Sequence, residues 1–149
     1  MTQREQIIKY IETQLNKSLI LKFVTRRLAS YDDLKSFAGT QFPLACMVSG
    51  LPVAQDKLSS RIQGTIEKTI SALSIDCYVY LMDSSDSKAD SLISDTADEL
   101  KKLILSDPRQ GKLVLSTSIE FEPHVGRWDP FVAFKITIKM NYLHTTGGI

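Results

Sequence analysis

The stretch Leu73-Ser-Ile-Asp-Cys-Tyr-Val-Tyr-Leu81 carries an apolar residue at every second position. This period of two predicts a β-strand with one buried face. The polar stretch 83–86 then favours a turn, and Ser87 with Asp90 has the spacing of a helical capping box. Apolar residues follow at helical spacing and predict an amphipathic helix packed on that strand face: Ala89, Leu92, Ile93, Ala97, Leu100, Leu103 and Ile104.

The N-terminal segment predicts a second capped helix. Thr2 and Glu5 have capping-box spacing, and the helix is expected to end between residues 16 and 18. Its apolar face consists of Ile7, Ile8, Ile11 and Leu15. Further along we expect a short strand within 19–25, a helical turn within 31–39 and a buried strand at Leu44–Val48.

The polar segment from Val53 to Gly64 has no convincing period. It reads as an exposed loop, or as the tip of a long hairpin whose arms are Leu44–Val48 and Ile66–Met82. Loops of this length in compact domains are usually functional or disordered. Because no core position requires it, we expect a functional segment.

The C-terminal part predicts two more strands. Asp107-Pro108 should stop the helix and Gly111 should turn the chain. A half-exposed strand is expected at 113–122, with Leu113, Leu115, Thr117, Ile119 and Phe121 on one face, followed by a loop from Pro123 to Pro130. The last strand should bury Val132, Phe134, Ile136, Ile138, Met140 and Tyr142, and 143–149 should be a flexible tail.

The predicted order is helix, short strand, two longer strands, helix and two strands. This order favours an α+β fold in which two main α-helices pack on one face of a mostly antiparallel β-sheet. The 149 residues correspond to about one domain, and no repeat or linker divides them. We therefore expect a single domain over 1–149.

The charge of the chain is balanced overall but uneven along its length. With 18 basic and 17 acidic side chains, the net charge of +1 provides no field toward nucleic acid or a membrane surface. Residues 1–30 carry six basic and two acidic groups, whereas 83–107 carry three basic and seven acidic. Two solvated faces explain this asymmetry most simply. If the chain self-associates, the opposite charges could help to set the contact geometry.

The N-terminus and the cysteines indicate where the protein is made. The polar N-terminus lacks the apolar core of a signal peptide, and no apolar run reaches the roughly 20 residues that cross a bilayer. Cys46 and Cys77 lie in apolar strand patterns, which are typical of inert core residues. We expect synthesis inside the cell and no membrane association.

Residues that could carry chemistry are few. His124 and His144 stand 20 positions apart without further ligands at metal spacing. Glu120 and Glu122 share a strand face and could form an acid pair, although a polar outer sheet face explains them more readily. No phosphate-binding glycine loop and no nucleophile elbow occurs. We expect no catalysis, no metal and no cofactor.

The whole pattern resembles the tail terminator proteins of tailed bacteriophages, also called tail completion or neck proteins. The stretches that carry the resemblance follow the capped N-terminal helix and are spread over nearly the whole chain. They are patterns of strands and turns rather than catalytic signatures. They are Phe42-Pro-Leu-Ala-Cys-Met-Val-Ser-Gly50, the strand 73–83 running into a helix closed by Ser106-Asp-Pro108, and Trp128-Asp-Pro-Phe-Val-Ala-Phe-Lys-Ile-Thr-Ile-Lys-Met-Asn-Tyr142.

The resemblance implies a subunit of a homo-oligomeric ring, a hexamer, found in the tail or neck of the virion. Such a ring sits on the tail tube protein, stops tail polymerisation and docks the head completion or connector protein. DNA passes through its channel without sequence-specific binding. The segment 50–64 and the loop 123–130 would then contact neighbours, which makes these residues interface candidates: Leu51, Val53, Lys57, Arg61, Arg127, Trp128 and Phe131.

Several alternatives remain open at this stage. Trp128 and Phe131 could instead close the edge of the core, and Lys57, Arg61 and Arg127 could line the channel or form salt bridges. The chain could also be a small monomeric adaptor or assembly chaperone that binds one partner through an exposed sheet edge. A weaker third hypothesis is a small hydrolase that uses Glu120 and Glu122.

Overall fold

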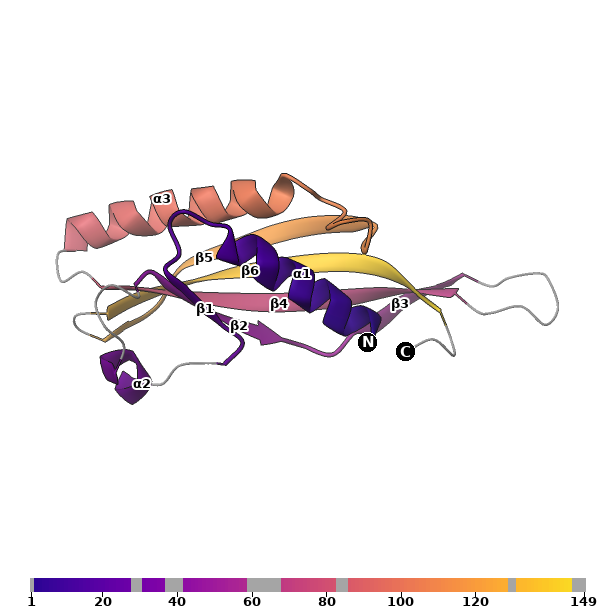
Figure 1. The fold of residues 1–149 in the computed structure, drawn as a ribbon, viewed down its shortest axis with the longest axis horizontal. Coiled ribbons are helices and arrows are strands. Elements are labelled where there is room, and N and C mark those ends of the chain that lie inside the picture. The colour runs from indigo at the N-terminus through magenta and orange to yellow at the C-terminus, as the bar shows by residue number, and fades with distance from the viewer. Residues whose placement is uncertain are drawn as a thin grey trace.

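The computed structural model of the chain describes residues 2–27, 31–36, 42–58, 68–82, 86–128 and 131–145. Its elements confirm the predicted α+β class and form an elongated molecule (Figure 1). In chain order they are α1 (Gln3–Asn16), β1 (Phe23–Thr25), α2 (Tyr31–Ser36), β2 (Leu44–Ser49), β3 (Val53–Leu58), β4 (Lys68–Met82), α3 (Asp86–Leu105), β5 (Ser116–Trp128) and β6 (Phe131–Thr145).

All six strands belong to one sheet, which is built around the β4–β6 pair. The strand order is β1-β2-β4-β6-β5, and β3 pairs with β4 beyond the end of β2. Every pairing is antiparallel except that of β1 with β2. The β4–β6 ladder is the longest and places Ile75 opposite Ile138. Both strands alternate strongly in the sequence, so their register buries one complete face of each.

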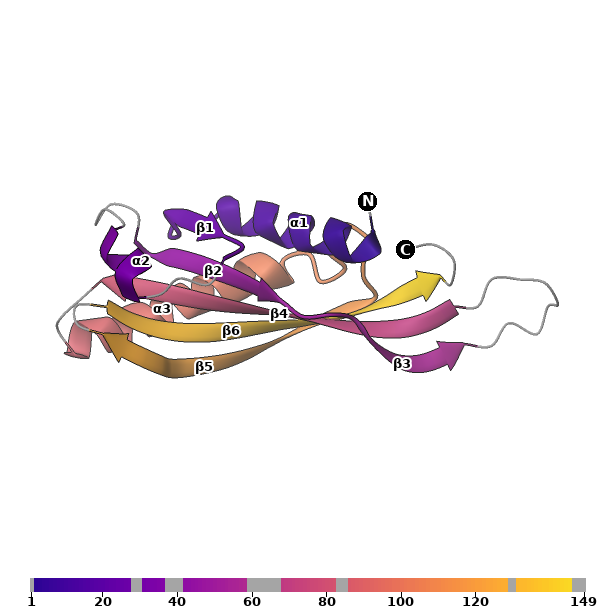
Figure 2. The same ribbon diagram turned by 90° about the horizontal axis from the view of Figure 1, so that it is seen from below.

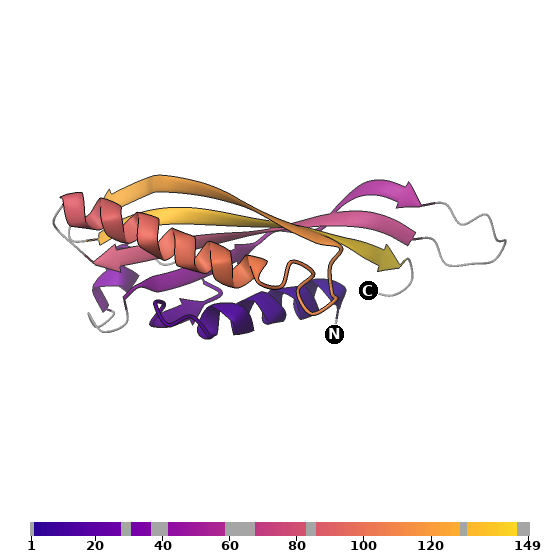
Figure 3. The same ribbon diagram turned by 90° about the horizontal axis from the view of Figure 1, so that it is seen from above.

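The main core lies between the sheet and the helices α1 and α3, which cover the same sheet face (Figures 1 and 3). The predicted faces of β4 and β6 are confirmed, because their inward residues, from Leu73 to Leu81 and from Val132 to Tyr142, are buried. The predicted face of α1 is buried as well. In α3 the buried residues of the stripe are Ile93, Ala97, Leu100 and Ile104, whereas Leu92 points outward and is 42% exposed.

A second, smaller core lies on the opposite sheet face at one end of the molecule, where α2 covers it (Figures 1 and 2). Leu34 from α2 packs with Phe42 and Phe131, whose stacked rings lie 5.4 Å apart. Leu44, Cys46, Tyr80 and Ala133 complete the cluster. This second core explains why Ala133, on the face of β6 expected to be outward, is buried.

Two segments expected to be loops are strands. Residues 53–58 form β3 and pair with β4, so 53–58 is an arm of the hairpin rather than its tip. Residues 123–128 continue β5, because a register shift between Glu122 and Gly126 accommodates the extra residues. The rest of these two predicted loops, 59–64 and 129–130, lies outside the described residues.

Three predicted boundaries were also wrong. The helix α3 begins at Asp86, so Ser87 lies in its first turn and is not its cap. The strand β5 begins at Ser116, because backbone with positive φ at Gln110, Gly111 and Lys112 occupies the preceding turn. The strand β6 runs to Thr145 instead of ending before 143, and the Leu143 carbonyl accepts a 2.8 Å hydrogen bond from the Gln3 side chain.

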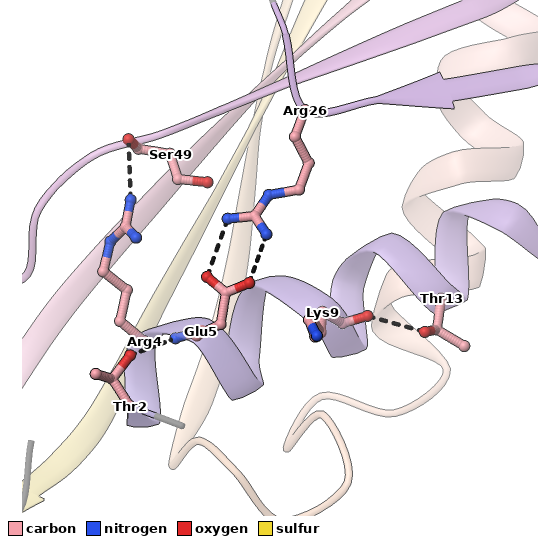
Figure 4. A network of polar contacts seen from close by, with 7 residues as sticks. All are labelled: Thr2, Arg4, Glu5, Lys9, Thr13, Arg26 and Ser49. Atoms are coloured by element: carbon pink, nitrogen blue, oxygen red, sulfur yellow. Dashed lines mark hydrogen bonds and ion pairs between the residues drawn. The ribbon is translucent and has the colours of Figure 1, made fainter.

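Polar contacts fix the N-terminus of α1 against the β1 and β2 side of the sheet (Figure 4). The Thr2 hydroxyl accepts from the Glu5 backbone N–H, as the capping box predicts. The Glu5 carboxylate, however, accepts from both terminal nitrogens of Arg26 instead of capping the helix. This hydrogen bond from Arg26 holds the Glu5 pKa below its usual value.

The turn after α3 depends on a glycine, and Gly111→Ala is expected to lower the free energy of unfolding by about 1–3 kcal/mol. Gly111 has φ +65°, and a Cβ there would lie 2.8 Å from the Tyr10 ring. Gly50→Ala is the matched control, because a Cβ at Gly50 meets only the Ser74 carbonyl at 3.7 Å. Urea unfolding of both variants tests this. Equal losses would mean that the turn does not constrain residue 111.

The same turn predicts a pH dependence of stability. The Tyr10 hydroxyl and the Gly111 N–H both donate to Asp107 Oδ2 at 2.7 Å and lower the pKa of this carboxyl. A lowered folded pKa stabilises the native state above the unfolded value of about 3.9, and this stability is lost as the pH falls through the folded pKa. Asp107→Asn and Tyr10→Phe should therefore lose less stability than wild type between about pH 5 and pH 3. Unchanged slopes in urea titrations would contradict this.

Candidate assembly surfaces

Among the described side chains, the residues that the sequence offered for chemistry do not form one cluster. Cys46 and Cys77 are buried thiols, and burial raises the pKa of the Cys77 thiol to about 12. Within the described residues, no group of three His, Cys, Asp or Glu side chains could hold a metal ion. His144 packs edge-on against Tyr142, and its Nδ1 lies 3.1 Å from Gln3 Oε1.

The two predicted acid-pair residues are separately paired with lysines on the open face of the sheet. Glu120 contacts Lys139 at 2.7 Å, and Glu122 contacts Lys135 at 3.2 Å. In each pair the side chains are partly or largely exposed, so the pairs contribute little to stability. Their arrangement across neighbouring strands is that of a solvated sheet face.

One free sheet edge is formed by β5. This strand is last in the strand order, and no described strand pairs with its outer side. Beside it, a groove of about 210 Å³ separates β5 from α3. Its apolar lining is Ala97, Ile119, Phe121 and Ile136, and its polar lining is Ser94, Asp98 and Lys101. An unpaired edge beside an apolar groove is the arrangement that accepts an added extended segment.

A second free edge lies on the other side of the sheet. In the described part of the chain, β3 pairs only with β4, and β1 covers only residues 44–46 of β2. Leu51 and Val53, between β2 and the body of β3, are 80% and 64% exposed. Arg4 borders this edge and donates to the Gly50 carbonyl at 3.0 Å. It also donates, more weakly, to the Ser49 carbonyl (Figure 4). The edge is thus apolar with a neighbouring cation.

The two sides of the sheet differ in charge. The helix α1 has two basic and two acidic side chains and β1 has none, so the basic excess of segment 1–30 comes from the residues that flank β1: Lys17, Lys22, Arg26 and Arg27. The helix α3, next to β5, belongs to the acidic segment 83–107. The charge asymmetry of the sequence is therefore distributed across the width of the sheet. Surfaces of opposite sign attract and orient one another during association.

The predicted interface residues differ in their exposure and in whether the structure describes their side chains. Leu51 and Val53 are exposed, as contacts to a neighbour require. Phe131 is 3% exposed and belongs to the second core, so the core alternative holds for it and its side chain offers no contact to a neighbour. The backbone of Lys57 lies in β3, and the backbones of Arg127 and Trp128 lie in β5, but their side chains are outside the described part, as is all of Arg61.

Sequence reasoning missed the α3–β5 groove. The alternation of β5 predicted that Ile119 and Phe121 share one face, and the structure shows that this face lies beside α3. What the alternation could not reveal is that α3 leaves Phe121 uncovered, with 44% exposure. Phe121 contacts Phe134 edge-on, with ring centroids 5.7 Å apart. The only available signal was that a phenylalanine occupies a strand that otherwise reads as half-exposed.

Comparisons with known proteins do not assign the chain to a family. The chain matches no protein-family model, and no curated protein is significantly similar to it. In the described part of the chain, no helix combines the length and the hydropathy needed to cross a membrane.

Proposed function

We propose that this chain is a structural subunit that assembles into a hexameric ring and acts as the tail terminator of a tailed bacteriophage. Its ring would cap the tail tube protein, stop tail polymerisation and form the surface that docks the head completion or connector protein. DNA would pass through the channel without sequence-specific contacts, and the protein would reside in the virion. The α+β fold and the resemblance of its strand and turn patterns support this proposal.

The observation that carries the self-assembly is the presence of two different free edges on one sheet. One edge presents exposed Leu51 and Val53 beside Arg4, and the other presents Phe121 and a groove beside acidic α3. Two unlike, complementary surfaces on one subunit favour head-to-tail contacts, which close into a ring when the rotation permits. A self-complementary patch would instead favour a two-fold dimer.

Native mass spectrometry over a concentration series tests the proposal, together with negative-stain images. The expected species has six times the 16.7 kDa chain mass and appears as a ring with an open centre. If the chain stays monomeric, purified tail tubes are added, because a tube end can template the ring. A chain that remains monomeric and does not bind tube ends would overturn the proposal.

A monomeric adaptor is the second candidate, and the unpaired β5 edge favours it. An adaptor would bind one extended partner segment along this strand. It would stay monomeric at all concentrations and form a one-to-one complex. The same mass spectra separate the two functions by their stoichiometry. A ring-forming subunit, unlike an adaptor, must bury on the order of 1,000 Å² or more at each contact with another copy.

A further inference from the structure

We infer that the α3–β5 groove of one copy receives Leu51 and Val53 of a second copy. This inference rests on the proposed self-assembly and adds which two surfaces meet. The receiving surface consists of Ile119, Phe121 and Ile136 with the adjoining face of α3. The entering side chains are the exposed Leu51, just before β3, and Val53, at its start.

The size and lining of the groove suit side chains better than a small molecule. Its volume of about 210 Å³ lies below the roughly 300–1,000 Å³ of typical small-molecule sites. Most of its lining is aliphatic or aromatic, with Asp98 and Lys101 as charged neighbours. Asp98 is already paired with Lys102 at 3.0 Å. The groove therefore offers room and apolar contact for a few aliphatic side chains.

Leu51 and Val53 match this groove in chemistry and spacing. Both are aliphatic, and residues two apart in an extended segment point to the same side. At 80% and 64% exposure they leave apolar surface in water that a groove could bury. The outer side of β5, with which no described strand pairs, borders the groove and can add backbone hydrogen bonds to the same extended segment.

Within one molecule these side chains cannot reach the groove. Val53 pairs with Ala72, Ala72 with Asn141, and Asn141 with Ser116 at the start of β5. Three strand spacings of about 4.8 Å therefore separate Val53 from β5, with β4 and β6 between them. The contact must be made between two copies, and because its two halves differ, it is head-to-tail.

Charge complementarity identifies a second copy as the occupant. The entering edge lies beside the guanidinium of Arg4, whereas the receiving groove lies on α3, whose sequence has five acidic and three basic residues. Each copy thus carries both an entering edge and a receiving groove, so the entering edge of one copy can meet the groove of the next. Such pairing steers copies into one orientation and disfavours contact between like edges.

Cysteine cross-linking of the full chain tests the contact. In Val53→Cys/Ser94→Cys, the second cysteine is nearly isosteric and lines the groove. A short bifunctional thiol reagent should give a ladder of covalent oligomers. The control is Val53→Cys/Leu92→Cys, because Leu92 is exposed on α3 but does not line the groove, and it should give no ladder. Natural Cys46 and Cys77 are buried and should not compete.

The outcomes separate this inference from the proposed function. Oligomers in the mass spectra without a ladder, or equal ladders from both cysteine pairs, would overturn the groove contact and leave ring assembly intact. Monomers that neither cross-link nor bind tube ends would overturn both. As a second variant, Ser94→Trp should fill the groove and shift assembly to at least tenfold higher concentration, whereas Leu92→Trp should not. Binding of another protein at the groove, without a ladder, would assign the site to an adaptor.

Discussion

Phe134→Ala should lower the free energy of unfolding by about 3–5 kcal/mol, because it removes a fully buried aromatic ring from the main core. Phe134 is 0% exposed and lies on β6, the strand that pairs with both β4 and β5. A loss of this size is a large part of the roughly 5–15 kcal/mol that holds a domain together. Guanidinium unfolding followed by circular dichroism measures it.

Phe121→Ala provides the matched control for that measurement. It deletes the same ring from the other member of the edge-on pair, but at a position that is 44% exposed. Its expected cost is about 1–2 kcal/mol, which combines the lost aromatic contact with partial burial. If the two variants lost equal stability, the core would not lie between β6 and the helices, and the burial described for Phe134 would be wrong.

The sequence predicted those elements whose two faces meet different surroundings. In β4 and β6 one face meets the helices and the other is largely polar, so the alternation from Leu73 to Leu81 and from Val132 to Tyr142 is directly readable. The same holds for the apolar face of α1. Burial on one side imposes a period, and that period is what a single sequence can show.

The elements that were missed lack this asymmetry. The strand β3 is the segment Val-Ala-Gln-Asp-Lys-Leu, which carries no apolar period. The end of β5 contains Pro123 and Gly126, which resemble loop residues until the register shift beside them is known. The second core draws Phe131 from the start of β6 and Leu34 from α2, two residues that only the folded chain brings together.

The candidate surfaces were predictable only in part. The segment around Leu51 and Val53 was expected to make contacts because no core position needed it, and both side chains are exposed. The groove could not be expected, because it depends on how α3 lies across β5. The helix α3 packs on both β5 and β6 but leaves Phe121 44% exposed, and a local sequence pattern does not show how a helix lies across a sheet.

Val53→Asp is expected to weaken self-association by at least about tenfold, because a carboxylate that enters this mostly apolar groove loses its hydration, and Lys101 at the groove offsets that loss only in part. The fold should be retained, since Val53 is 64% exposed. Native mass spectrometry over a concentration series measures the loss. Met82→Asp is the control: Met82 is also exposed, lies ten residues along β4 from the partner of Val53, and should leave assembly unchanged. If Val53→Asp assembles as wild type does while Met82→Asp does not, the contact lies at the other end of the sheet.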